Sequence, residues 1–156
     1  MNSRILRVYA DTTIFGGVFD PEYEKPSQAF FQEVQSGKFR LVTSAVVQNE
    51  IETGPPQLRE FYEKTIGLAG IVNLSEDVWK LHQAYLNAES ISPELILDAL
   101  HVAMATVSEC FAIVSWDFKN LVHYKKIRFY NAINLLEGYS QISIYSPLEV
   151  ISYEPR

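Results

Sequence analysis

Cysteine is almost absent from this sequence, because Cys110 is the one residue of its type among 156. A single thiol cannot form an intrachain disulfide, and it cannot supply the cysteine clusters that bind structural zinc. Secreted disulfide scaffolds and cysteine-based zinc domains are therefore both excluded. Proteins without disulfides are typical of reducing compartments, so we expect a cytoplasmic protein.

Long apolar runs are missing as well. No stretch of about 20 apolar residues occurs, as a membrane-spanning helix requires. Arg4 and Arg7 lie around a short apolar run near the first residue, but the roughly 10 apolar residues of a secretory signal do not follow. The seven glycines and seven prolines form no linker. We expect a single domain over residues 1–156, with no membrane segment.

Positive charge is scarce: 13 Lys and Arg against 19 Asp and Glu give a net charge of −6. This balance excludes a basic coat that would hold duplex DNA non-specifically. One stretch, 118–136, has four bases and no acid, so it carries +4 while the remaining nine bases and 19 acids give −10. Its bases are Lys119, Lys125, Lys126 and Arg128, and its aromatic residues include Tyr124, Phe129 and Tyr130. The stretch is either a solvated helix face or a surface that binds RNA phosphates and stacks bases.

Short apolar segments that favour strands alternate along the chain with segments of helical periodicity. The predicted strands are 5–10, 39–43, 70–74, 111–115 and 141–145, and the predicted helices lie at about 26–36, 45–53, 56–67, 75–86, 93–109 and 121–136. The strands are apolar on both faces, which is typical of a parallel sheet covered by helices on both sides. The sequence therefore predicts an α/β fold of three layers.

Several local signals accompany this pattern. Ser44, Ser75 and Ser92 each precede a helical segment and are predicted as N-caps. The pair 16–17, two glycines, lacks the context of a phosphate-binding loop and is predicted as a turn. His82 and His123 belong to no motif and are expected to face solvent.

Four acids fall where a parallel sheet would bring them together. Asp11 follows the first strand and Asp117 follows the strand at 111–115, so both are expected at the carboxyl edge of the sheet. Glu50 lies within two turns of the start of the helix after the second strand. Asp98 lies in an apolar helical run, where an acid costs stability unless something pairs with it.

Convergence of these acids would require compensation. At about 6 Å and an effective dielectric constant near 20, each pair of like charges costs roughly 3 kcal/mol. Such a cluster persists only if the acids share protons or hold a divalent cation. An all-oxygen ligand set suits Mg²⁺ or Mn²⁺ better than zinc.

The segments around these acids resemble a known family. In order, they are 8–13 (VYADTT), 43–51 (TSAVVQNEI), 98–105 (DALHVAMA) and 115–120 (SWDFKN). They are similar to the four signature blocks of PIN-domain ribonucleases, and most similar to the VapC-like toxins of toxin–antitoxin pairs. The resemblance covers about residues 5–150. It departs from the family at the early breaker 54–56 (GPP), and a Lys that often precedes the third block is absent.

The resemblance implies a function and a set of roles. A PIN-like ribonuclease would hydrolyse RNA phosphodiester bonds with one or two Mg²⁺ or Mn²⁺ ions, form a homodimer and be blocked by a small antitoxin. Asp11, Glu50, Asp98 and Asp117, called here the acidic quartet, would be the metal ligands and the catalytic centre. Thr13 and His101 would be supporting neighbours of this site.

Each residue also has a plainer interpretation. Asp11 could cap a short helix starting at residue 12, Asp117 could cap the turn after it, and Glu50 could be a solvated helix residue. Asp98 could be a buried acid paired with an arginine or a helix end, and His101 a structural hydrogen-bonding residue.

Two other functions remain open. An α/β phosphatase would use Asp11 as a covalent nucleophile, but such enzymes have a second Asp two residues on, where this chain has Thr13. Alternatively, a catalytically weak PIN-like module would only bind RNA or a protein partner.

Overall fold

The computed structural model describes residues 5–88 and 93–151. Five strands form one sheet in the order β3-β2-β1-β4-β5, and every pairing is parallel. The strands are β1 (Leu6–Ala10), β2 (Phe39–Ser44), β3 (Ala69–Val72), β4 (Ala112–Val114) and β5 (Ser143–Tyr145). The predicted α/β class is therefore confirmed.

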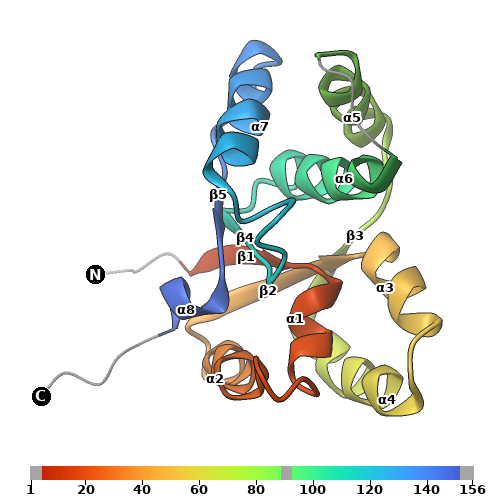
Figure 1. Ribbon diagram of the computed structural model, residues 1–156, viewed down its shortest axis with the longest axis vertical. Coiled ribbons are helices and arrows are strands. Elements are labelled where there is room, and N and C mark those ends of the chain that lie inside the picture. The colour runs from red at the N-terminus through yellow and green to blue at the C-terminus, as the bar shows by residue number, and fades with distance from the viewer. Residues whose placement is uncertain (1–4, 89–92, 152–156) are drawn as a thin grey trace, which may run out of the picture.

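Helices cover both faces of this sheet (Figure 1). On one side lie α1 (Thr12–Gly17), α2 (Glu24–Gln35), α3 (Ala45–Glu52) and α4 (Pro56–Thr65), which leads into a 3₁₀ turn at Ile66–Leu68. On the other side lie α5 (Glu76–Ala88), α6 (Pro93–Val107) and α7 (Tyr124–Leu136). The short α8 (Pro147–Val150) packs against α2. No helix in the described part of the chain is long and apolar enough to cross a membrane.

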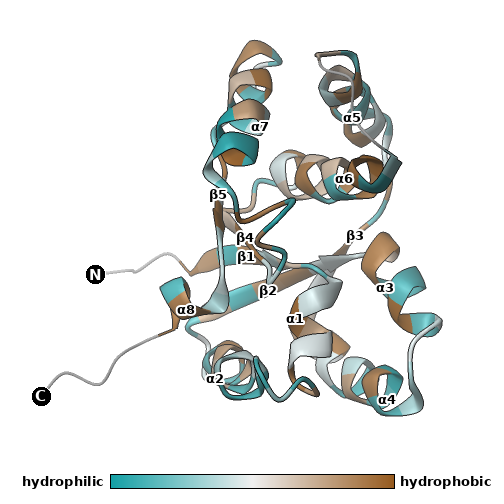
Figure 2. Ribbon diagram, in the orientation of Figure 1, coloured by the Kyte–Doolittle hydropathy of each residue, from teal (hydrophilic) through white to brown (hydrophobic). Residues whose placement is uncertain are grey.

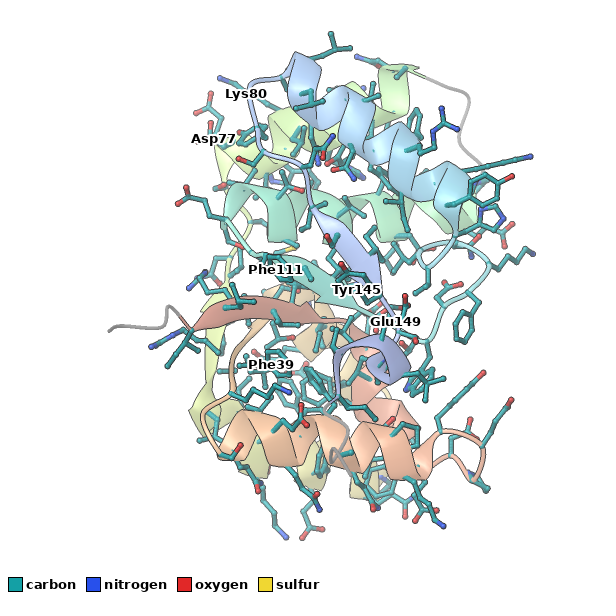
Figure 3. The ribbon with its side chains drawn as sticks, turned by 90° about the vertical axis from the view of Figure 1, so that its left-hand side faces the viewer. Phe39, Asp77, Lys80, Phe111, Tyr145 and Glu149 are labelled. Atoms are coloured by element: carbon teal, nitrogen blue, oxygen red, sulfur yellow. The ribbon has the colours of Figure 1, made fainter. Side chains whose placement is uncertain are left out.

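The central strands are buried because their side chains are apolar on both faces. Val8, Tyr9 and Ala10 of β1 are all buried, and so is the whole of β4. The helices carry both hydrophobic and hydrophilic residues (Figure 2), and the buried hydrophobic ones form one core with the strands. Side chains fill the space between the layers (Figure 3). Phe39, labelled in Figure 3, stacks on Phe30 of α2 with 5.9 Å between ring centroids. This packing joins the strands and helices in one hydrophobic core.

The predicted caps agree with the structure where it describes them. The Ser44 hydroxyl accepts a hydrogen bond from the Val47 amide at 3.2 Å, and Ser75 accepts one from the Val78 amide at 3.2 Å. Ser92 lies outside the described residues. Side chains that satisfy the free amides of a first turn explain why these helices begin where they do.

Three expectations are wrong. Gly16 and Gly17 belong to α1 and do not form a turn. His82 is 6% exposed, and its Nε2 lies 2.9 Å from the Ile96 carbonyl oxygen, so it joins α5 to α6 instead of facing solvent. The helix expected from residue 121 begins at residue 124 as α7, because His123 caps it by accepting from the Lys125 amide.

The two glycines of α1 differ in their surroundings, and this difference is testable. A Cβ on Gly17 would lie 2.4 Å from Ser27 Oγ and 2.7 Å from Trp116 Nε1, whereas one on Gly16 would meet nothing within 4 Å. We expect Gly17→Ala to lower the free energy of unfolding by about 1–3 kcal/mol through overpacking. Gly16→Ala, the matched control, should be neutral or stabilising by up to about 1 kcal/mol. Urea unfolding midpoints measure both, and equal effects would contradict the close packing at Gly17.

Candidate functional site

The acidic quartet comes from all three layers of the fold. Asp11 directly follows β1, and Asp117 lies three residues beyond β4, the strand paired with β1 through Ala10 and Val114. Glu50 belongs to α3 and Asp98 to α6, which lie on opposite sides of the sheet (Figure 1). Both sheet acids therefore stand at the carboxyl edge, where ligands bind in parallel sheets.

Asp11 is held by two hydroxyl groups. Its Oδ1 accepts hydrogen bonds from the Thr13 amide at 3.1 Å and the Thr13 hydroxyl at 2.6 Å, so it does cap α1. Its Oδ2 accepts from the Ser115 hydroxyl at 2.6 Å. Burial raises the pKa of this carboxyl, while both hydroxyls act in the opposite direction by stabilising the charged form.

Ser115 is a site residue that the sequence reasoning missed. Its hydroxyl also accepts from the Asp117 amide at 2.9 Å, and the Trp116 amide donates to the Thr13 hydroxyl at 2.8 Å. These bonds tie the turn after β4 to the end of β1. A hydroxyl residue directly after a buried strand and two positions before an acid was the signal that could have identified it.

Asp117 caps the turn that follows it, as the plainer interpretation predicts. Its Oδ1 accepts from the amides of Lys119 at 3.2 Å and Asn120 at 2.9 Å. Its Oδ2 makes no hydrogen bond with any residue that the structure describes. The cap therefore fixes the carboxylate and leaves one oxygen for another ligand.

Glu50 and His101 contact each other although they come from opposite layers. His101 Nε2 lies 3.3 Å from Glu50 Oε1, and the same oxygen accepts a hydrogen bond from the Thr12 hydroxyl. Partial burial tends to raise the pKa of Glu50, but the contacts with His101 and Thr12 outweigh it and lower the pKa. His101 is 3% exposed and also bonds the Tyr9 hydroxyl, so it has the structural hydrogen-bonding role left open above.

Asp98 is the acid of the quartet that no described donor contacts directly. It forms no hydrogen bond or ion pair with any described residue, and its side chain is half-buried. Desolvation is the largest cause that raises its pKa to about 6. The charges of Asp117, Asp11 and Glu50 add to the effect, and the interaction with His101 opposes it. The four acids are thus close enough for their charges to oppose one another.

The donor chemistry of the quartet fits a hard divalent cation, because its ligand atoms are all carboxylate oxygens. Asp98, with no partner, has both oxygens free, and Asp117 has one. Within residues 5–88 and 93–151, however, no three acidic, histidine or cysteine side chains are already gathered as a metal-binding group.

The basic stretch 118–136 lies beside these acids. The pKa of buried Tyr130 in α7 is raised by desolvation and then by the charges of Asp98 and Asp117, which places this helix next to them. The four bases of the stretch form no ion pair with any described residue. Tyr124 is 63% exposed, but Tyr130 is only 2% exposed, so the expectation that Tyr130 could stack on bases is wrong.

Comparisons with known proteins find likeness in fold. No protein-family model matches the chain, and no curated protein matches its sequence. The structure of FitAB bound to an IR36 DNA fragment is similar at a TM-score of 0.57 and 12% identity, over 96% of this chain and 99% of that one. A toxin–antitoxin complex from Klebsiella pneumoniae is similar at a TM-score of 0.56 and 16% identity, over 72% of this chain and 88% of that one. The chain has the PIN-like α/β fold.

Proposed function

We propose that this protein is a ribonuclease that depends on Mg²⁺ or Mn²⁺ and hydrolyses RNA phosphodiester bonds at the acidic quartet. The observation that carries the proposal is Asp98, an acid without a partner whose pKa is raised partly by the other three acids. Like charges that His101 offsets only in part, at the carboxyl edge of a parallel sheet, favour a divalent cation as a further partner.

The residues of the quartet would divide the work by how firmly they are held. Asp11 and Asp117 are fixed by hydroxyl and amide donors, and Glu50 is held by Thr12 and His101, while Asp98 has no such donor among the described residues. When bound, a divalent cation activates water for attack at phosphorus and offsets charge on the leaving oxygen. No side chain needs to act as a nucleophile, because the role of the carboxylates is to hold and orient the cation.

Charge and fold support a proposal for the substrate and the partners. The bases of 118–136 would bind the phosphates of single-stranded or loop RNA beside the quartet, with Tyr124 available for stacking. The Klebsiella structure is a toxin–antitoxin complex, so we propose that this protein is the toxin of such a pair and binds a small antitoxin protein. Homodimer formation is a further part of the proposal.

A second candidate is a PIN-like module that binds RNA or a partner with little catalysis. It is favoured by the absence of a preformed metal-binding group in the described residues and by the hydrogen bonds that occupy both oxygens of Asp11. A module of this kind would show no thermal shift with Mn²⁺ and no cation-dependent cleavage, so the first two experiments below distinguish the candidates.

The first experiment tests Asp98 as an uncompensated charge. In chelator at pH 7.5 we expect Asp98→Asn to be more stable than wild type by about 1–2 kcal/mol. The full shift from 3.8 to about 6 corresponds to roughly 3 kcal/mol, which solvent screening reduces. Millimolar Mg²⁺ or Mn²⁺ should raise the melting temperature of wild type more than that of the variant.

The pH dependence gives this experiment its internal check. The folded-state pKa of Asp98 lies above its ordinary value, so the destabilisation is full above about pH 6 and disappears as the pH falls towards 4. The advantage of Asp98→Asn should shrink over the same range. Glu94→Gln, an exposed acid on the same helix, is the matched control and should change little. A constant advantage of Asp98→Asn at all pH values would contradict the charge explanation.

The second experiment examines the products of RNA cleavage. We expect cleavage of single-stranded RNA to require Mg²⁺ or Mn²⁺ and to leave 5′-phosphate and 3′-hydroxyl ends, because water attacks the phosphorus directly. Asp11→Asn and Asp98→Asn should each abolish cleavage and remain folded, while His101→Ala should keep measurable activity.

The end groups decide between mechanisms. Products with 2′,3′-cyclic phosphate would show that the ribose 2′-oxygen attacked, a route that needs a general base and acid instead of a carboxylate site. Full cleavage by Asp11→Asn in chelator would refute the proposed mechanism.

The third experiment tests the basic stretch. Replacing Lys125 and Lys126 with Ala should weaken RNA binding and reduce the slope of log affinity against log salt by up to about 1.4, at roughly 0.7 for each lost phosphate contact. The double variant Lys25→Ala/Lys64→Ala makes the same charge change on α2 and α4, across the sheet from α7, and should leave the slope unchanged. Equal slopes for both double variants would show that α7 is an ordinary solvated helix that does not bind RNA.

A further inference from the structure

A buried chain of hydrogen bonds leads from the core to the acidic quartet. The Tyr9 hydroxyl lies 2.8 Å from Ser44 Oγ and 2.7 Å from His101 Nδ1, and His101 Nε2 lies 3.3 Å from Glu50 Oε1. Tyr9 and Ser44 are fully buried. The chain therefore joins β1, β2 and α6 to the acid carried by α3.

The protons that each group carries determine which group donates and which accepts in this series of hydrogen bonds. Because the Glu50 carboxylate can only accept, the facing His101 Nε2 must carry a proton, and in a neutral ring Nδ1 is then an acceptor. Tyr9 donates its single proton to Nδ1, which leaves its oxygen to accept from Ser44. The Ser44 oxygen is itself held by the Val47 amide at 3.2 Å. Burial raises the pKa of Tyr9 and so keeps its proton in place.

This arrangement holds the imidazole at both nitrogens. A ring bonded only to Glu50 could rotate about its side-chain torsions or turn over, but the bond at Nδ1 fixes its plane and its tautomer. Glu50 is half-exposed near the end of a short helix, and its other side-chain partner is the Thr12 hydroxyl. The orientation of its carboxylate therefore depends on the ring.

We propose that Tyr9 is a positioning residue, which fixes the Glu50 carboxylate at the candidate site through the ring of His101. The hydrogen bonds from Tyr9 to Glu50 do not depend on the proposed function. Their consequence for cation binding rests on it. Tyr9 belongs to β1 and lies two residues before Asp11, which directly follows that strand. The strand β1 would therefore support two members of the quartet: Asp11 at its end and Glu50 through the ring.

Another tyrosine in the same protein has a purely structural role and can serve as a control for Tyr9. Tyr85 is also fully buried, and its hydroxyl donates to Asn134 Oδ1, which belongs to no site described above. Tyr85→Phe therefore removes a buried tyrosine hydroxyl without touching the quartet. It serves as the matched control for Tyr9→Phe.

The experiment reads the imidazole directly. In the full ¹⁵N-labelled chain, proton–nitrogen correlation spectra should show His101 with its proton on Nε2, and His101→Asn identifies its signals. We expect Tyr9→Phe to shift the Nδ1 resonance and broaden the Nε2–H signal through faster exchange with water, whereas Tyr85→Phe leaves both unchanged. Unchanged His101 signals in Tyr9→Phe, or a proton on Nδ1 in wild type, would overturn the proposal.

Calorimetric titration with Mn²⁺ then tests the consequence. Tyr9→Phe should weaken Mn²⁺ binding about tenfold, and Tyr85→Phe should not. If the His101 signals respond while Mn²⁺ affinity stays at the wild-type value, the positioning role in cation binding is overturned and the proposed function stands. If wild type itself binds no Mn²⁺, the proposed function fails, and the His101 signals alone still decide whether Tyr9 positions Glu50.

Discussion

The geometry of the whole carboxyl edge depends on how one buried carboxylate, Asp11, is satisfied. Thr13 and Ser115 hold one oxygen each, and the same two hydroxyls accept the amides of Trp116 and Asp117. The end of β1, the start of α1 and the turn after β4 are thereby locked together. Trp116 extends the lock to α2, because its indole donates to Ser27 Oγ at 2.8 Å.

Hydroxyl partners have a different electrostatic effect from basic ones. A lysine or arginine beside a carboxylate neutralises it, whereas a hydroxyl orients it and leaves its charge. Within the described residues, no Lys or Arg forms an ion pair with any member of the quartet. The edge therefore keeps its negative charge, and the stability lost at Asp98 is the cost of keeping it.

The fold, and the placement of Asp11 and Asp117 at the carboxyl edge of the sheet, could be predicted because both leave local marks in the sequence. Strands that are apolar on both faces indicate a parallel sheet covered by helices. Asp98 is recognisable because it is an acid within an apolar run. Ser115 and Tyr9 leave no such mark. The partner of Ser115 lies 104 residues away in the sequence, and a tyrosine in a strand is expected to be an ordinary core residue. Gly17 is similar, since the need for a small residue appears only once Trp116 is placed against it.

The origin of the quartet in three layers has a consequence for the growing chain. Asp11 and Glu50 lie in the first third of the sequence, but Asp98 and Asp117 follow much later, and α6 must dock across the sheet from α3 before all four acids meet. The complete set of acids is therefore present only after most of the chain has been synthesised and both helical layers have docked on the sheet. A shorter, unfinished chain carries Asp11 and Glu50 without the other two acids.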